Sequence, residues 1–525
     1  MATLDSLPEL IQALHNPLLY PHPAKNIRLL ETHISWVLLA GRYAYKIKKP
    51  VDFGFLDFSA PARRRFYCEE EIRLNRRLAP GLYLDVVAIG GEPGRPVFGG
   101  EPAFEYAVKM RRFSTRKTLD ALLQRGGLQT GHIDSLAETI AIFHAALPAT
   151  DAGSDFGVAD NVLAPALDNF HQLAALLASE AGESLMTLRR ACEAEFSRCQ
   201  ALFAQRREQG MIRECHGDLH LGNIVLLRGK PTPFDGIEFN PDLRWIDTVS
   251  DIAFLLMDLR YRGRADLAYR FLDAYLQHTG DYAGCGVLRF YLAYRAMVKA
   301  KVNALRAHQG DTMAVNACHD YLRLATRMVA ERGPALIVTH GLPGCGKTTV
   351  SQWLLEKFGA IRLRSDVERK RLFGLGARQS SQSQAEHGIY TQDATETTYR
   401  RLLALSRQIL LSGFPVIVDA AFLKRQERQQ FQRLADELEL PFAIVDVHAD
   451  EGLLTQRLAQ RQRENRDASE AGVEVYTLLK AVAEPLAGDE KPFTVEVVNN
   501  LDGFGQSNLA FCEKLKRITG LADIG

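Results

Sequence analysis

The sequence predicts a multidomain chain of α+β and α/β structure, with a two-lobed amino-terminal part followed by a parallel-sheet domain. Residues 30–110 mix short apolar runs with one charged helical stretch, as in a small antiparallel sheet that carries a helix. Residues 118–205 and 252–329 have helical periodicity, and the segment 214–251 between them is rich in loops. Beyond 334, apolar runs alternate with helical segments, which is typical of a parallel sheet covered on both faces.

Length and punctuation divide the chain further. With 525 residues, of which 46% are hydrophobic, the chain is too long for one core, and about two to four domains are expected. The sequence Glu331-Arg332-Gly333-Pro334 breaks the helical pattern just before an apolar strand. We therefore expect a small mixed lobe at 1–112, a mainly helical lobe at 113–330 and a third domain at 334–525.

Charge and cysteine content exclude several classes of protein. The formal net charge of +1 gives no global basic field, so a dedicated nucleic-acid binder is disfavoured, although local basic patches stay possible. The eight cysteines form no C-x-x-C pair, which favours reduced thiols over disulfides or zinc. The start of the sequence does not resemble a signal peptide, and no apolar run is long enough to span a membrane. A cytoplasmic location is expected, and the oligomeric state stays open.

A glycine-rich octapeptide indicates a phosphate-binding loop (P-loop). It follows the apolar run 335–338 and opens onto a helical segment, the context in which such a loop binds nucleotide phosphates through backbone N–H groups. The lysine can reach the outer phosphates and the threonine hydroxyl can hold Mg²⁺. We expect ATP and Mg²⁺ to bind here, in contact with Gly341, Gly344, Cys345, Gly346, Lys347, Thr348 and Thr349.

Three side chains follow later strands of the same domain. Asp366 comes just after a predicted second strand, where a carboxylate can accept the proton of an attacking hydroxyl. Arg369, one helical turn on, can grip phosphate oxygens, and Asp419 ends an apolar strand, where it can order Mg²⁺. The alternatives are a helix cap, a solvated arginine and a strand-end cap.

A pair of arginines indicates a lid. Arg457 and Arg461 are four residues apart on one helical face, which can close over a transferring phosphate, although charge runs are usually solvated surface. The region has no Asn-Lys-x-Asp, which disfavours a guanine-specific GTPase.

From about 334 to 520 the chain resembles small P-loop kinases related to polynucleotide 5′-hydroxyl kinases, zeta toxins and gluconate kinases. The resemblance implies that Asp366 is the general base, that Arg369 positions substrate, and that Arg457 or Arg461 is the lid arginine. It implies phosphoryl transfer to a hydroxyl without naming the acceptor.

A second candidate site lies in the loop-rich segment. The run 216–223 reads H-x-D-x₄-N, and Asp235 follows after an apolar stretch. This spacing suits phosphoryl transfer, with Asp218 accepting the proton of an acceptor hydroxyl while Asn223 and Asp235 hold Mg²⁺. Turn-forming residues that cap helices are one alternative, and a metal site on the two histidines at 216 and 220 is another.

Residues 25–305 resemble the aminoglycoside and choline phosphotransferases, which have a two-lobed, protein-kinase-like fold. The resemblance implies that Lys46 grips the α- and β-phosphates and pairs with Glu70 or Glu71, and Lys48 is a rival for the lysine. It also implies that Asp251 braces the segment 216–223. The sequence departs from protein kinases in having no G-x-G-x-x-G before Lys46.

These patterns predict a phosphotransferase with two nucleotide sites, acting on small-molecule or nucleotide-like acceptors. Over nearly its whole length the chain resembles proteins labelled as bifunctional fusions of an aminoglycoside phosphotransferase and an ATP-binding protein. An ATP-dependent switch that transfers nothing is the rival. A third option is 5′-hydroxyl polynucleotide kinase activity, prompted by the basic residues Arg362, Arg364, Lys370 and Arg371 around Asp366.

Overall fold

The computed structural model describes residues 7–54, 56–177, 182–377, 379, 389, 391–464, 473–500 and 509–524. The chain separates into two compact units, each described here by itself. The predicted domain bounds at 112 and 334 remain predictions. Unit 1 comprises Met1–Leu136, Phe143–Asn161 and Ala204–Leu255, and unit 2 comprises Ala137–Ile142, Val162–Phe203 and Leu256–Gly525.

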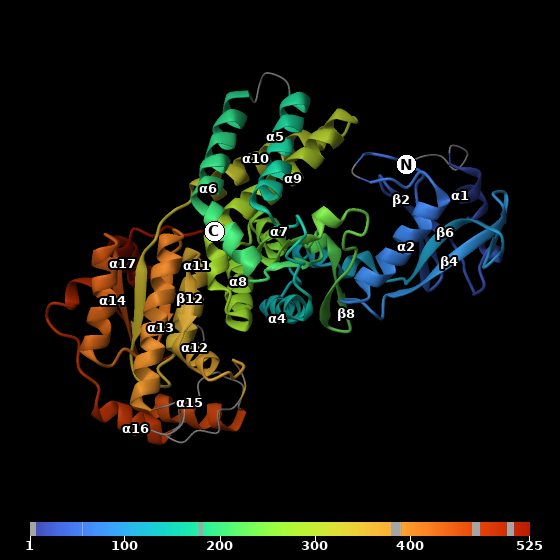
Figure 1. Ribbon diagram of the computed structural model, residues 1–525. Helices are drawn as coiled ribbons and strands as arrows, with labels where there is room; N and C mark the ends of the chain where they lie inside the picture. The colour runs from blue at the N-terminus through green and yellow to red at the C-terminus, as the bar shows by residue number, and fades with distance from the viewer. Residues whose placement is uncertain are drawn as a thin grey trace. The chain divides into compact units, whose positions relative to one another are not determined.

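A six-stranded antiparallel sheet opens unit 1, in the order β1-β2-β3-β6-β4-β5. Alternate residues of its central strands, such as Leu38, Tyr45 and Ile47, are buried in one apolar core, as period-2 patterning requires. Helix α2 packs on β4 and β6, so the predicted sheet carrying one helix is confirmed (Figure 1). The bounds are α1 Glu9–Ala13, β1 Arg28–Glu31, β2 Ser35–Ala40, β3 Tyr43–Lys48, α2 Pro61–Asn75, β4 Tyr83–Glu92, β5 Arg95–Phe98 and β6 Ala103–Arg111.

Short strands and loops make up the rest of unit 1, together with parts of longer helices that run into unit 2. Two small antiparallel ladders, β7 with β10 and β8 with β9, flank the segment that contains the H-x-D-x₄-N run. The bounds are α3 Leu119–Gln124, α4 Thr130–Ala146, α5 Ala159–Leu176, α6 Gly182–Glu208, β7 Ile212–Glu214, β8 Ile224–Leu227, β9 Lys230–Pro233, β10 Trp245–Asp247 and α7 Thr248–Tyr261.

Unit 2 combines helices with a five-stranded parallel sheet in the order β12-β13-β11-β14-β15. Strand β11, which precedes the P-loop, is central as expected, and its apolar residues pair with β13 and β14 on either side. Helices surround the sheet (Figure 1). The bounds are α8 Ala265–Thr279, α9 Cys285–His308, α10 Thr312–Ala330, β11 Leu336–His340, α11 Lys347–Phe358, β12 Ile361–Arg364, α12 Ser365–Leu372, α13 Gln392–Leu411, β13 Val416–Asp419, α14 Arg425–Glu437, β14 Phe442–His448, α15 Glu451–Glu464, α16 Val473–Ala481, β15 Thr494–Val498 and α17 Leu509–Thr519.

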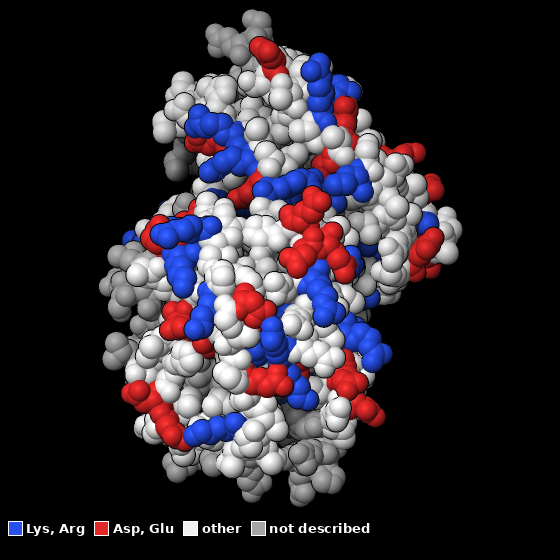
Figure 2. Space-filling view, turned by 90° about the vertical axis from the view of Figure 1, so that its left-hand side faces the viewer, with Lys and Arg blue, Asp and Glu red and all other residues white. Residues whose placement is uncertain are grey.

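Two properties of the surface bear on function. Among the described residues, no helix has the length and apolar character needed to cross a membrane. Lys and Arg side chains intermingle with Asp and Glu side chains over the face shown in Figure 2. This mixing agrees with a net charge near zero.

Candidate functional site

Two carboxylates hold the ammonium group of Lys46. This lysine lies on β3, and its Nζ is 2.9 Å from Glu71 Oε1 and 2.6 Å from Asp235 Oδ1. Burial alone would lower the pKa of Lys46, but Asp235 and Glu71 outweigh burial and hold the pKa well above its usual value. Asp235 keeps 44% of its side chain exposed, whereas Glu71 is fully buried. A strand, a helix and a loop from distant parts of the sequence thus converge on one cation.

A second buried lysine shares Glu71. Lys48 Nζ lies 2.8 Å from Glu71 Oε2 and also bonds Glu238, and the Lys48 side chain is fully buried. Burial raises the pKa of Glu71, but Lys46 and Lys48 outweigh it and lower the value to about 2. Glu70, the alternative partner in the sequence, pairs instead with Arg73 at 2.8 Å. Two lysines and two glutamates therefore form one buried charge cluster beside Asp235.

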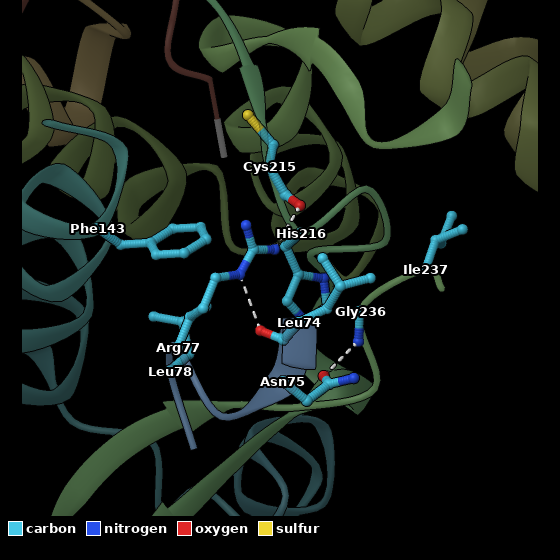
Figure 3. A pocket seen from close by; sticks show the side chains of 9 residues that line it. All are labelled: Leu74, Asn75, Arg77, Leu78, Phe143, Cys215, His216, Gly236 and Ile237. Atoms are coloured by element: carbon cyan, nitrogen blue, oxygen red, sulfur yellow. Dashed lines mark hydrogen bonds between the residues drawn. The ribbon is translucent and has the colours of Figure 1, made fainter. Parts of the chain in front are cut away.

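Helix α2 docks onto the loops through one face. Asn75, one turn after Glu71, accepts a 2.8 Å hydrogen bond at Oδ1 from the backbone N–H of Gly236. Arg77, just beyond the helix, donates to the carbonyls of Leu74 and Cys215 at 2.9 and 3.3 Å. Figure 3 shows these side chains around the small pocket between helix and loops. The hydrogen bond from Gly236 to Asn75 holds α2, which carries Glu71, against the loop that carries Asp235, a predicted Mg²⁺ ligand.

The predicted base and its neighbours form a tight hydrogen-bonded loop. Asn223 donates from Nδ2 to Asp218 Oδ2 at 2.8 Å, and its backbone carbonyl accepts from the N–H of Phe234 at 2.9 Å. Asp218 keeps 32% of its side chain exposed. Asp235 follows Phe234 in the left-handed backbone region, with φ of 61°, which is unusual for a residue other than glycine and is common at functional sites. Asn223 thus directly precedes β8, and Asp235 follows β9, the strand that pairs with β8.

His216 contacts both the loop that contains Asp218 and the loop that contains Phe234. Its Nε2 lies 3.0 Å from the carbonyl oxygen of Phe234, and its Nδ1 accepts from the N–H of Asp218 at 3.4 Å. Burial lowers the pKa of His216, although Asp251 opposes this. A neutral imidazole protonated at Nε2 satisfies both contacts, so His216 acts as a structural tie rather than a metal ligand.

Asp251 braces the same segment, as the resemblance implied. This fully buried carboxylate accepts from the backbone N–H groups of His216 and Gly217 at 3.2 and 2.8 Å, and from His144 Nε2 at 3.1 Å. His144, Cys215 and Asp251 bring possible ligand atoms within 4.8 Å of one another. Burial raises the pKa of the Cys215 thiol well above its usual value.

The P-loop has the backbone geometry that its glycines predict. Gly341, Gly344 and Gly346 all have positive φ, at 141°, 87° and 93°. A Cβ on Gly346 would lie only 1.9 Å from Asn499 Nδ2. Lys347 curls over the loop, donating from Nζ to the carbonyls of Gly341 and Leu342 at 2.9 and 3.0 Å. Its ammonium group therefore lies at the mouth of the loop.

One arginine of the predicted lid reaches this loop. Arg457 on α15 donates to the carbonyl of Asn499 at 3.0 Å, and Asn499 donates to the carbonyl of Cys345 at 3.2 Å. The backbone of Arg461 belongs to the same helix, but its side chain lies outside the described residues. Asn499 thus connects Arg457 to the loop.

The other predicted residues of this domain occupy different settings. Asp419 is 5% exposed, and its Oδ2 accepts from the hydroxyl of Ser351 at 3.2 Å. Asp366 is half-buried in the first turn of α12. Arg369 is 8% exposed and donates to the Ile389 carbonyl and the Thr395 hydroxyl, both at 3.0 Å. The roles assigned to these residues remain predictions.

Several residues of both sites lie outside the sequence motifs. The position of Lys48 still marks it in the sequence, because it follows Lys46 by two residues and so shares its strand face. Its partner Glu238 is marked only by lying close to Asp235 in the sequence. Asn75 and Asn499 follow no pattern that the sequence alone reveals. Arg362 and Lys370, two of the basic residues that prompted the nucleic-acid option, are only 3% and 1% exposed.

Two known families match different parts of the chain. The phosphotransferase enzyme family matches residues 118–288, and an AAA domain matches residues 336–486. Among curated proteins, the uncharacterized protein Rv2004c of Mycobacterium tuberculosis H37Rv is 31% identical over 454 residues, covering 85% of this chain and 89% of that protein. The uncharacterized protein Mb2027c of Mycobacterium bovis matches with the same values.

Two solved structures are similar to parts of the chain at low sequence identity. A choline/ethanolamine kinase family protein from Mesorhizobium loti is 11% identical with a TM-score of 0.39, and covers 61% of this chain and 94% of its own. A putative kinase from Chloroflexus aurantiacus is 21% identical with a TM-score of 0.29, and covers 36% of this chain and 99% of its own.

Proposed function

The chain belongs to the family of these mycobacterial proteins, its match to the phosphotransferase enzyme family precedes its match to an AAA domain, and we propose that it transfers the γ-phosphoryl group of ATP to hydroxyl acceptors at two sites. The observation that carries the proposal is the position of Lys46 Nζ, bonded to Glu71 and Asp235 at 2.9 and 2.6 Å. A lysine fixed by a buried glutamate beside a half-exposed aspartate suits the binding of nucleotide phosphates next to Mg²⁺.

In the first site, Lys46 binds the α- and β-phosphates and Asp218 accepts the proton of the acceptor hydroxyl. The hydroxyl oxygen forms a bond to the γ-phosphorus while the bond to the β-phosphate oxygen breaks, and ADP leaves. The oxygens of Asn223 and Asp235 are the hard ligands that Mg²⁺ prefers, so these two residues fit the ion. Mg²⁺ supplies neutralisation of phosphate charge when bound.

In the second site, the backbone of Gly341, Gly344 and Gly346 cradles the phosphates, and Lys347 swings from the loop carbonyls onto the outer phosphates. Asp366 accepts the acceptor proton. The Thr348 hydroxyl and Asp419 fit Mg²⁺ by the same oxygen chemistry. Arg369 positions the acceptor, and Arg457 and Arg461 neutralise charge on the transferring group.

Small metabolites are the favoured acceptors. Arg362 and Lys370 are almost fully buried, so they are not available to a nucleic-acid backbone. The face shown in Figure 2 carries both signs of charge, which gives no further support to a polynucleotide substrate. We therefore place hydroxyl-bearing small molecules or nucleotide-like compounds ahead of 5′-hydroxyl ends.

Paired substitutions in the full-length chain test the proposal. A metabolite library is incubated with ATP and scanned for a mass gain of one phosphate, using wild type, Asp218→Asn and Asp366→Asn. Each substitution should abolish one distinct activity and leave the other intact. Asp393→Asn is a matched control, because Asp393 is exposed in the first turn of α13 just as Asp366 begins α12. Retention of every activity in both variants would overturn the proposal, and tight ATP binding without any transfer would favour the switch.

A further inference from the structure

An ion pair at the start of the P-loop helix joins two parts of unit 2. Arg362 on β12 forks onto Asp273 of α8, with Nε 3.2 Å from Oδ1 and Nη2 2.7 Å from Oδ2. Both side chains are 4% exposed. A buried bidentate pair of this kind has a fixed geometry, because the guanidinium and the carboxylate are both planar.

The remaining donors of Arg362 hold the first turns of α11. Nη1 donates to the carbonyl of Thr348 at 3.1 Å and to the hydroxyl of Ser351 at 3.2 Å. Nη2 also donates to Gln352 Oε1 at 2.7 Å. The five N–H groups of the guanidinium thus have five acceptors, of which two belong to Asp273.

These contacts lead directly to the proposed Mg²⁺ ligands. Thr348 follows the P-loop lysine, and Ser351 donates to Asp419 Oδ2 at 3.2 Å. Arg362 is therefore one hydrogen bond from Thr348 and two from Asp419. The position of Arg362 is in turn set by a carboxylate on α8, which precedes the P-loop segment in the sequence.

Helix α8 also contacts α11 further along. Arg270 Nη1 is 2.8 Å from Glu356 Oε1, and a Cβ on Gly359 at the end of α11 would lie 2.8 Å from the ring of Tyr269. Tyr269 and Asp273, at i and i+4, fall on one face of α8, and Arg270 points about 100° away from Tyr269. Helix α8 thus lies against α11 near Glu356 and Gly359, and it reaches the first turns of α11 through Arg362.

We propose that Asp273 is a positioning residue for the P-loop nucleotide site, acting through Arg362 on Thr348, Ser351 and Asp419. The inference rests on the proposed function only in taking the P-loop as a nucleotide site. Under this proposal the P-loop nucleotide site depends on α8, a helix that lies within residues 118–288, the match to the phosphotransferase enzyme family.

The test measures ADP binding to the full-length chain by calorimetry. The P-loop contribution is defined as the part that Lys347→Ala removes. Asp273→Asn keeps the shape of the side chain and removes its charge, so ADP affinity at the P-loop should fall about tenfold. Asp266→Asn is the matched control, because Asp266 pairs with Arg264 on the first turn of α8 at 42% exposure, and its affinity should match wild type.

A double variant separates positioning from stability. Asp273→Leu with Arg362→Met removes both charges, which generally restores the folding stability that loss of one partner costs. Thr348 and Ser351 then still lack their donor, so the affinity should stay low although the thermal midpoint recovers. This variant also decides the case if Asp273→Asn does not fold.

Two results would overturn the inference. One is wild-type ADP affinity in Asp273→Asn, and the other is recovery of full affinity in the double variant, which would make the pair purely structural. If Lys347→Ala binds ADP as wild type does, both the proposed function of the loop and the inference are overturned. The Lys347→Ala comparison therefore distinguishes the two failures.

Discussion

Replacing Lys48 by methionine tests the buried charge cluster. The wild-type ammonium lies between Glu71 and Glu238, whose side chains are 0% and 4% exposed. Methionine fills the space but leaves one cation, Lys46, for three neighbouring carboxylates. Breaking a buried pair in this way costs about 3–5 kcal/mol of folding free energy. Lys49→Met is the neighbouring control, because Lys49 pairs with the 39%-exposed Glu31 and should cost only about 0–1 kcal/mol.

The pH dependence identifies the cause of the loss. Burial raises the pKa of Glu238 even with Lys48 present, so without Lys48 the folded protein should bind a proton there that the unfolded chain releases. Stability of Lys48→Met should then rise as pH falls from neutrality toward the unfolded value near 4.5, by up to about 1.4 kcal/mol per pH unit. Adding Glu238→Gln should remove this slope.

Urea denaturation between pH 5 and 8, followed by intrinsic fluorescence, measures both effects on wild type and the variants. The reasoning is refuted if Lys48→Met and Lys49→Met lose the same stability. A flat pH profile for Lys48→Met would equally refute it, because an unpaired buried carboxylate must titrate.

Three further outcomes are expected. Gly346→Ala should weaken ADP binding at the P-loop about tenfold by calorimetry, because its Cβ would meet Asn499 Nδ2 at 1.9 Å; Gly374→Ala, also at positive φ but in open space, should not. Asp251→Asn should lower the urea midpoint, because each buried N–H group that loses its acceptor costs about 1–3 kcal/mol. An unchanged midpoint would contradict the role of Asp251 in holding the segment 216–223. Because the pKa of Glu71 is lowered to about 2, the stabilisation from its charge is present above pH 4.5 and is lost progressively as the pH falls from 4.5 to about 2. Urea denaturation of Glu71→Gln should therefore show a smaller loss of stability over this pH range than that of wild type.

The features that could be predicted from the sequence depend on residues that lie close together along the chain. The P-loop octapeptide after an apolar run, the central place of its strand and the two-lobed start of the chain all follow from patterns within a few residues of each other. The brace of the segment 216–223 by Asp251 followed from the resemblance and agrees with its hydrogen bonds. Asn75, Glu238 and Asn499 were not found, because their partners lie far away in the sequence and no spacing marks them.

By itself the sequence determined the family of each part, the fold class, and the short motifs in which a backbone turn and its side chains come from one stretch of chain. Only the tertiary structure decided which glutamate meets Lys46. Successive helix residues point about 100° apart, so Glu70 and Glu71 differ by their phase on α2 and not by their chemistry. The pairing of Asp273 with Arg362, 89 residues apart, was likewise set by packing, because a buried charge requires a partner from whichever element lies against it.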